Sequence, residues 1–151
     1  MSILELIHVT KHFGGLTAVD DVSFAVNDGE LLGIAGPNGS GKSTLFNVIT
    51  GIPYHASAGQ IRFAGQPITG AAPHRIARLG LVRTFQKDAE FPDLSARETL
   101  SLAASYGRGL DRRAAQEATE AQLDTVEFDA SRADMSTTEL SVYERKQLMI
   151  A

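Results

Sequence analysis

A glycine-rich stretch holds the residues of this sequence that are best suited to chemistry. It reads GPNGSGKST over Gly36–Thr44 and matches the pattern G-x-x-x-x-G-K-[ST] in full. Glycines let the backbone bend so that successive N–H groups face one anion, and the N-terminus of a following helix adds partial positive charge. We therefore predict a loop that binds the phosphates of a nucleotide.

Two side chains of this loop have distinct predicted roles. Lys42 places a full positive charge on the β- and γ-phosphates, which makes it a predicted catalytic residue. Ser43 offers a hydroxyl oxygen to Mg²⁺, a cation that usually reaches nucleotide sites together with the phosphates. The loop does not identify the nucleotide, and the alternative is a glycine-rich turn that matches by chance. The predicted binding residues are Gly36, Pro37, Asn38, Gly39, Ser40, Gly41, Lys42, Ser43 and Thr44.

The segments on either side of the loop support this prediction. The apolar run ELLGIA, residues 30–35, predicts a strand that is buried on both faces. After the loop, the apolar residues of KSTLFNVITG follow a helical spacing, and Gly51 suits the helix C-cap. A strand, a glycine-rich loop and a helix in this order are the context that the motif requires.

The remainder of the first part predicts short strands and turns. LELIHV and VSFAV are predicted strands, and DG at 28–29 is a predicted hairpin-type turn. A strand pair is predicted around GQIRFAGQPI, followed by a short helix between Pro73 and Gly80 and a strand over GLVRTFQ. These elements predict an α/β core.

The second part predicts helices. SARE at 95–98 is a capping box that opens a helix ending near Gly107, and Asp111 can cap a second helix. We predict two domains, an α/β nucleotide-binding core over 1–91 and an α-helical subdomain over 92–151. The net charge of −4 lies wholly in the second of them.

Composition excludes several classes of protein. The absence of cysteine excludes disulfides, a thiol nucleophile and a thiolate metal site, and the net charge of −4 argues against nucleic-acid binding. Glu5 interrupts the N-terminal apolar residues, and no apolar run approaches the roughly 18 residues of a membrane span. The four histidines lack the spacing of metal ligands. We expect a soluble protein without direct membrane insertion.

Three further stretches resemble one family when they are taken in order. GLVRTFQ, FPDLSARETL and LSVYERKQLMIA resemble the Q-loop, the segment after it and the signature motif of the ATP-binding subunits of ABC transporters. HFGGLTAVDDVSF and HRIARLGLVRTFQ are most similar to the ATPases that drive import of branched-chain amino acids and related amides. The resemblance covers essentially the whole chain and implies the P-loop NTPase fold of ABC type.

The resemblance also assigns three residues outside the phosphate loop. Phe13 is implied to stack on adenine, although it could instead be a core or hairpin aromatic. Gln86 is implied as a catalytic residue that reaches Mg²⁺ or the attacking water, with a polar residue at a strand end as the alternative. Ser141 is implied to reach the γ-phosphate held by a second subunit.

The implied cofactors are ATP and Mg²⁺, and the implied partners are proteins. They are a second ABC ATPase subunit, in a homodimer or a heterodimer, and transmembrane permease subunits. This assembly places the chain in the cytoplasm, on the inner face of the cell membrane.

Two departures from the family pattern modify these expectations. The sequence holds no apolar strand ending in Asp-Glu, the Walker B element, so we expect the N-terminal portion of a longer ATPase, with hydrolysis absent from the 151 residues alone. The alternative is a non-hydrolysing module, complete at residue 151, that binds nucleotide or a partner.

The second departure lies in the signature motif. Val142 and Tyr143 replace its glycines, and Glu144 replaces its glutamine, which predicts a weaker composite site. Ser141 and Glu144 also form a predicted capping box.

Overall fold

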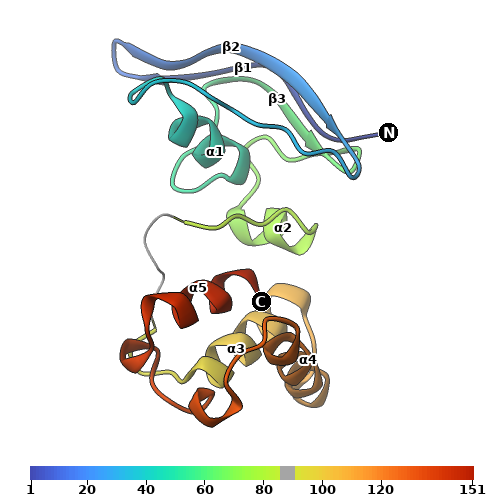
Figure 1. Ribbon diagram of the computed structural model, residues 1–151. Coiled ribbons are helices and arrows are strands. Elements are labelled where there is room, and N and C mark those ends of the chain that lie inside the picture. Colours follow the sequence, from blue (N-terminus) through green and yellow to red (C-terminus); the bar gives the residue numbers. More distant parts are fainter. Residues whose placement is uncertain (86–90) are drawn as a thin grey trace. The chain divides into compact units, whose positions relative to one another are not determined.

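The chain folds into two compact units, Met1–Val82 and Arg83–Ala151. The computed structural model describes residues 1–85 and 91–151, and each unit is considered by itself (Figure 1). Gln86 lies outside the described residues. The functional division predicted at residue 91 stays a prediction.

The first unit is built on an antiparallel sheet of order β2-β1-β3-β4. The two long strands are β1 (Ser2–Phe13) and β2 (Leu16–Asn27), and they contain the predicted strands LELIHV and VSFAV. The predicted strand pair around GQIRFAGQPI is also confirmed, as β3 (Ala58–Phe63) and β4 (Gln66–Pro67).

Two helices complete this unit. Helix α1 (Lys42–Thr50) begins within the glycine-rich stretch, directly after Gly41, and its C-cap residue is Gly51, whose left-handed backbone confirms the predicted C-cap. Helix α2 (Pro73–Arg78) has proline in its first turn, as predicted. Helix α1 lies against one face of the sheet (Figure 1). The shared core consists of Leu6, Val9, Val19, Leu45, Val48, Ile49, Ile61, Phe63, Ile68 and Ile76.

Two predicted strands are not formed in the described residues. Residues 30–35 and 81–85 have no regular secondary structure, and Leu31 is 99% exposed. A strand buried on both faces needs parallel neighbours that complete its hydrogen bonds and cover its side chains. Within residues 1–85 and 91–151, every named strand belongs to the antiparallel sheet, so these apolar segments have no such neighbour.

The second unit is helical. Helix α3 (Ala96–Arg108) begins with the predicted capping box of Ser95 and Glu98, and its C-cap residue is Gly109, close to the end predicted near Gly107. Helix α4 (Arg112–Thr125) is capped by Asp111, as predicted. The short 3₁₀ helices η1 (Ala130–Arg132) and η2 (Thr137–Glu139) lead to α5 (Val142–Ile150). The core of this unit consists of Ala96, Leu100, Leu123, Phe128, Ala133 and Leu140.

In the part of the chain that the structure describes, none of the helices has both the length and the apolar character needed to cross a lipid bilayer.

Candidate functional site

The N-terminus of α1 is open to an anion. Gly41 is its N-cap residue, with a left-handed backbone (φ 88°), and no side chain caps the helix. Because the first four N–H groups of a helix have no partner within it, they need a side chain, water or a ligand. The positive end of the helix dipole points the same way, so this terminus suits a phosphate.

Gly41 also fixes the loop against the sheet. A Cβ atom at this position would lie 2.2 Å from the backbone oxygen of Ala18 in β2. Real Cβ atoms do not approach a backbone carbonyl so closely, and the left-handed φ angle disfavours a side chain as well. Glycine is therefore the residue that allows the phosphate loop to pack on β2.

The Lys42 ammonium folds back over the loop. Its Nζ donates to the backbone oxygens of Gly36 and Pro37, both at 2.7 Å, and lies 3.4 Å from the Ser40 hydroxyl. These acceptors are neutral, whereas a phosphate oxygen is charged and forms a stronger hydrogen bond with an ammonium group. Lys42 is thus held within the loop in a position from which it can exchange carbonyls for phosphate.

Ser43 occupies the first turn of α1 with its side chain exposed. One hydroxyl alone is a weak magnesium ligand, and the described residues contain no group of three or more histidines or acids that could hold a metal. Mg²⁺ normally keeps several waters and binds with substrate phosphates rather than in an all-protein cage. Ser43 fits this mode of binding, in which the phosphates bring the ion to the loop.

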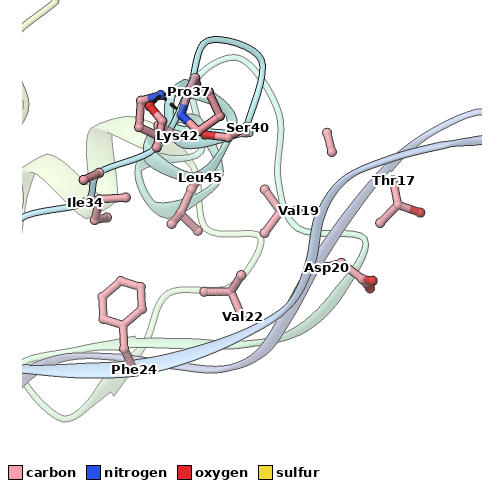
Figure 2. Close-up of a pocket in the computed structure, with 14 residues that line it drawn as sticks. Thr17, Val19, Asp20, Val22, Phe24, Ile34, Pro37, Ser40, Lys42 and Leu45 are labelled. Carbon is pink, nitrogen blue, oxygen red and sulfur yellow. Dashed lines mark hydrogen bonds between the residues drawn. The ribbon is translucent and has the colours of Figure 1, made fainter.

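A cavity of about 570 Å³ opens beside the loop. Its wall is largely apolar and includes Val22 and Phe24 of β2, while Ser40 and Lys42 lie near one another at its loop end (Figure 2). Thr17 and Asp20 of β2 add polar atoms along one side. The groups able to hold a phosphate are therefore concentrated at the loop end of the cavity.

Phe13 lies at the tip of the hairpin between β1 and β2. It pairs with Leu16 of β2. Ala18, whose backbone oxygen faces Gly41 of the loop, follows Leu16 by two residues, or about 7 Å along a strand. The residue is 40% exposed, and the centroid of its ring lies 4.8 Å from that of Tyr54 in a T-shaped arrangement. The ring is thus an exposed hairpin aromatic near the loop, and its contact with adenine stays a prediction.

Ser141 lies in the second unit, at the N-cap of α5. Its hydroxyl accepts from the Glu144 amide at 3.2 Å, and its own amide donates to the Glu144 carboxylate at 2.7 Å. This reciprocal pair confirms the predicted capping box. The role of Ser141 toward a phosphate stays a prediction, as does that of Gln86.

Arg132 pairs with Glu144 in an interaction that the sequence does not reveal. The guanidinium donates to the Glu144 carboxylate and, at 3.2 Å, to the backbone oxygen of Glu139. The hydrogen bonds from Arg132, and then those from Ser141, lower the pKa of Glu144 to about 2. The acid at the start of α5 is therefore ionised and matched by a cation, while Val142 and Tyr143 beside it are exposed.

The phosphate-loop residues predicted from sequence thus lie together in the first unit, along with two residues that the sequence did not single out. Ala18 and Tyr54 are ordinary strand and loop residues in sequence terms, without a motif to mark them. Their proximity to Gly41 and Phe13 depends on how the hairpin lies against α1.

Known proteins share this sequence pattern. A family model described as ABC transporter matches residues 19–151. The high-affinity branched-chain amino acid transport ATP-binding protein BraF of Pseudomonas aeruginosa is 45% identical over 101 residues, which cover 67% of this chain and 39% of that protein. A probable branched-chain amino acid transport ATP-binding protein, LivG of Archaeoglobus fulgidus, is 41% identical over 108 residues, which cover 71% of this chain and 42% of that protein. The chain spans about two fifths of the length of these curated relatives.

Solved structures share the fold. A nucleotide-free ATP-binding cassette from an ABC transporter superposes with a TM-score of 0.81 and 32% identity, covering 99% of this chain and 63% of that one. A structure described as the ADP conformation of an ATP-binding cassette of an ABC transporter gives a TM-score of 0.81 and 33% identity, and it too covers 99% of this chain and 63% of that one. These similarities confirm the predicted α/β P-loop fold of ABC type. The chain belongs to the ABC transporter family and carries a large part of its ATP-binding cassette.

Proposed function

We propose that this chain binds Mg-ATP as part of the ATP-hydrolysing subunit of an ABC importer for branched-chain amino acids. The observation that carries the proposal is the open N-terminus of α1, with Lys42 folded over the carbonyls of Gly36 and Pro37. The uncapped N–H groups of the helix terminus and the ammonium belong to the same loop and helix start, and together they offer the kinds of donor that a triphosphate requires. The amino-acid substrate is proposed from the relatives that transport it.

Each predicted residue has a role in this proposal. Backbone N–H groups of the loop, which Pro37 lacks, donate to the β- and γ-phosphates. Lys42 exchanges its carbonyl partners for phosphate oxygens, and Ser43 holds the Mg²⁺ that arrives with them. Bound Mg²⁺ neutralises charge on the transferring phosphoryl group. Phe13 stacks on adenine, and Gln86, outside the described residues, orients the attacking water.

The active assembly contains two such subunits and a permease. In this assembly, Ser141 at the start of α5 faces the γ-phosphate held by the other subunit, on the inner face of the membrane. Val142 and Tyr143 in the first turn of α5 carry side chains where close backbone approach favours glycine. We therefore propose that the composite site containing this signature hydrolyses ATP more slowly than its counterpart.

Titration of the 151-residue chain with Mg-ATP by calorimetry tests the binding proposal. Lys42→Ala should weaken binding about tenfold or more, because a charge-assisted hydrogen bond contributes about 1.5–3 kcal/mol. The control is Lys146→Ala, which removes an exposed lysine of α5 in the second unit. Equal affinities for the parent chain and the Lys42 variant would refute the proposal.

We also propose that these 151 residues bind Mg-ATP without turning it over, because they hold no apolar strand that ends in paired acids. The parent chain should release no more phosphate from Mg-ATP than buffer without protein does. Release that the Lys42→Ala variant lacks would contradict this part of the proposal and leave nucleotide binding intact.

A further inference from the structure

Three side chains of the first unit form a connected series from α1 to the hairpin tip. The Asn47 side-chain amide in α1 donates to the Tyr54 hydroxyl at 2.8 Å. The Tyr54 ring meets the Phe13 ring with centroids 4.8 Å apart and planes at 81°. Asn47 lies on the same helix as Lys42, which begins at the phosphate loop.

Tyr54 is fixed at both ends of its side chain. Its ring is half-buried and packs against the core cluster of the first unit, while its hydroxyl is held by α1. Edge-to-face contact with a second ring is a favourable arrangement of two aromatic quadrupoles. Tyr54 is therefore a fixed surface against which an exposed ring can adopt one orientation.

Phe13 needs such a surface because it lies at the end of a strand and is 40% exposed. The Lys11 ammonium lies over both rings, 5.0 Å from the Phe13 centroid and 5.2 Å from the Tyr54 centroid. These contacts restrict the ring before any ligand arrives, and a ring ordered in advance loses less entropy on stacking.

We propose that Tyr54 is a positioning residue for the nucleotide base, which acts by holding Phe13 in the orientation that stacks on adenine. The inference rests on the proposed nucleotide binding and adds a residue to it. Through Asn47, the same tyrosine connects the base-stacking ring to the helix that binds the phosphates. The site therefore binds the two ends of the nucleotide with elements held at a fixed separation.

The test compares a ligand that has a base with one that lacks it. Calorimetry measures the affinity of the 151-residue chain for Mg-ATP and for magnesium tripolyphosphate. Phe13→Ala should weaken Mg-ATP binding about tenfold, the size of one base–aromatic stacking interaction, and leave tripolyphosphate binding unchanged. Tyr54→Ala should weaken Mg-ATP binding about fivefold, again without affecting tripolyphosphate.

Two further variants separate positioning from folding. Tyr54→Phe keeps the ring contact and loses the Asn47 hydrogen bond, so it should show a smaller loss, about twofold, than Tyr54→Ala. Tyr106→Ala is the matched control, since this tyrosine is 71% exposed on α3 in the second unit, and its affinities should equal those of the parent chain.

The outcomes separate this inference from the function on which it rests. If Phe13→Ala weakens Mg-ATP binding and both Tyr54 variants do not, Tyr54 has no positioning role and nucleotide binding stands. If Tyr54→Ala lowers the affinity for Mg-ATP and for tripolyphosphate equally, the residue is structural and the inference is overturned. If the alanine variant fails to fold, the same result with Tyr54→Phe overturns the inference. Failure of the parent chain to bind either ligand overturns the proposed function, and this inference with it.

Discussion

Two helices of this chain begin at residues predicted to meet phosphate, and their first turns differ. Helix α1 begins at Gly41 with no capping side chain, and the adjacent ammonium of Lys42 is bound by loop carbonyls. Helix α5 begins at Ser141 with a complete capping box whose carboxylate is also paired with Arg132. The N–H groups at the start of α1 are available to an anion. At the start of α5, some of the N–H groups already donate to the side chains of the capping box.

The difference shows that a helix N-terminus is an anion site only where its N–H groups are available. Helix α3, which has no predicted role toward phosphate, begins with the same capping box as α5. By local structure alone, α5 resembles α3 more than it resembles α1. A role for α5 in a composite site must therefore come from what a second subunit presents to Ser141, Val142 and Tyr143 rather than from an open helix terminus.

The largest effect is expected from a side chain added at Gly41, where the start of α1 packs closely on β2. Gly41→Ala would direct a Cβ atom at the Ala18 backbone oxygen, which cannot rotate away as a side chain could. We expect loss of measurable Mg-ATP binding and a decrease of about 3 kcal/mol in the free energy of unfolding, the upper range for a strained backbone position. Calorimetry and urea unfolding followed by circular dichroism measure the two effects.

Gly39→Ala is the matched control for stability. This glycine has a similar φ angle of 83°, but a Cβ atom there would meet nothing within 4 Å. Only the intrinsic cost of a left-handed residue applies, about 1 kcal/mol. Equal unfolding midpoints for the two alanine variants would mean that the contact with Ala18 does not constrain the loop.

A smaller effect, dependent on pH, is expected at α5. The pKa of Glu144 is lowered from 4.5 to about 2, so the folded chain binds its proton less readily than the unfolded chain does. The stabilisation is complete above about pH 5 and is lost as the pH falls from 4.5 toward 2. We expect Glu144→Gln to lower the urea midpoint at pH 7 and to differ little from the parent chain near pH 2.

Glu139→Gln controls for the loss of one acidic residue. The Glu139 side chain is exposed, and Arg132 contacts its backbone oxygen, which the substitution leaves in place. The attraction between the Glu139 carboxylate and Arg132 is the smallest of those acting on Arg132, so the midpoint should change much less than that of the Glu144 variant. A Glu144 variant with the same midpoint as the parent chain at pH 7 would show that the Arg132 pair adds no stability to the helix.

The sequence predicted those elements whose determinants are local. The caps Ser95 and Asp111 and the C-cap Gly51 each act within a few residues of the helix end they specify, so the helices were predicted closely. The strands predicted over ELLGIA, residues 30–35, and GLVRTFQ, residues 80–86, depend on neighbouring strands instead, which a local apolar run cannot supply. Their failure reflects the non-local nature of a parallel sheet.

The same distinction applies to the site. The phosphate loop was predicted because its glycines, lysine and serine act at fixed spacing within one turn and one helix start. The Arg132–Glu144 pair spans η2 and the start of α5, and the Tyr54–Phe13 contact joins a loop to a hairpin tip. Neither has a spacing rule, because each depends on the path of the chain between its members.

The smallest effect tests whether the capping boxes of α3 and α5 are equivalent. Ser141→Ala and Ser95→Ala each remove a hydroxyl that accepts from an amide three residues later, both at 3.2 Å. Each should lower the free energy of unfolding by about 1 kcal/mol, measured by urea unfolding of the chain. In the assembled transporter, only Ser141→Ala should also slow ATP hydrolysis, because only that hydroxyl is proposed to face a nucleotide. Equal rates of ATP hydrolysis for the two variants would mean that Ser141 acts only as a helix cap. The start of α1 would then bind a ligand, while the start of α5 would have a structural role alone.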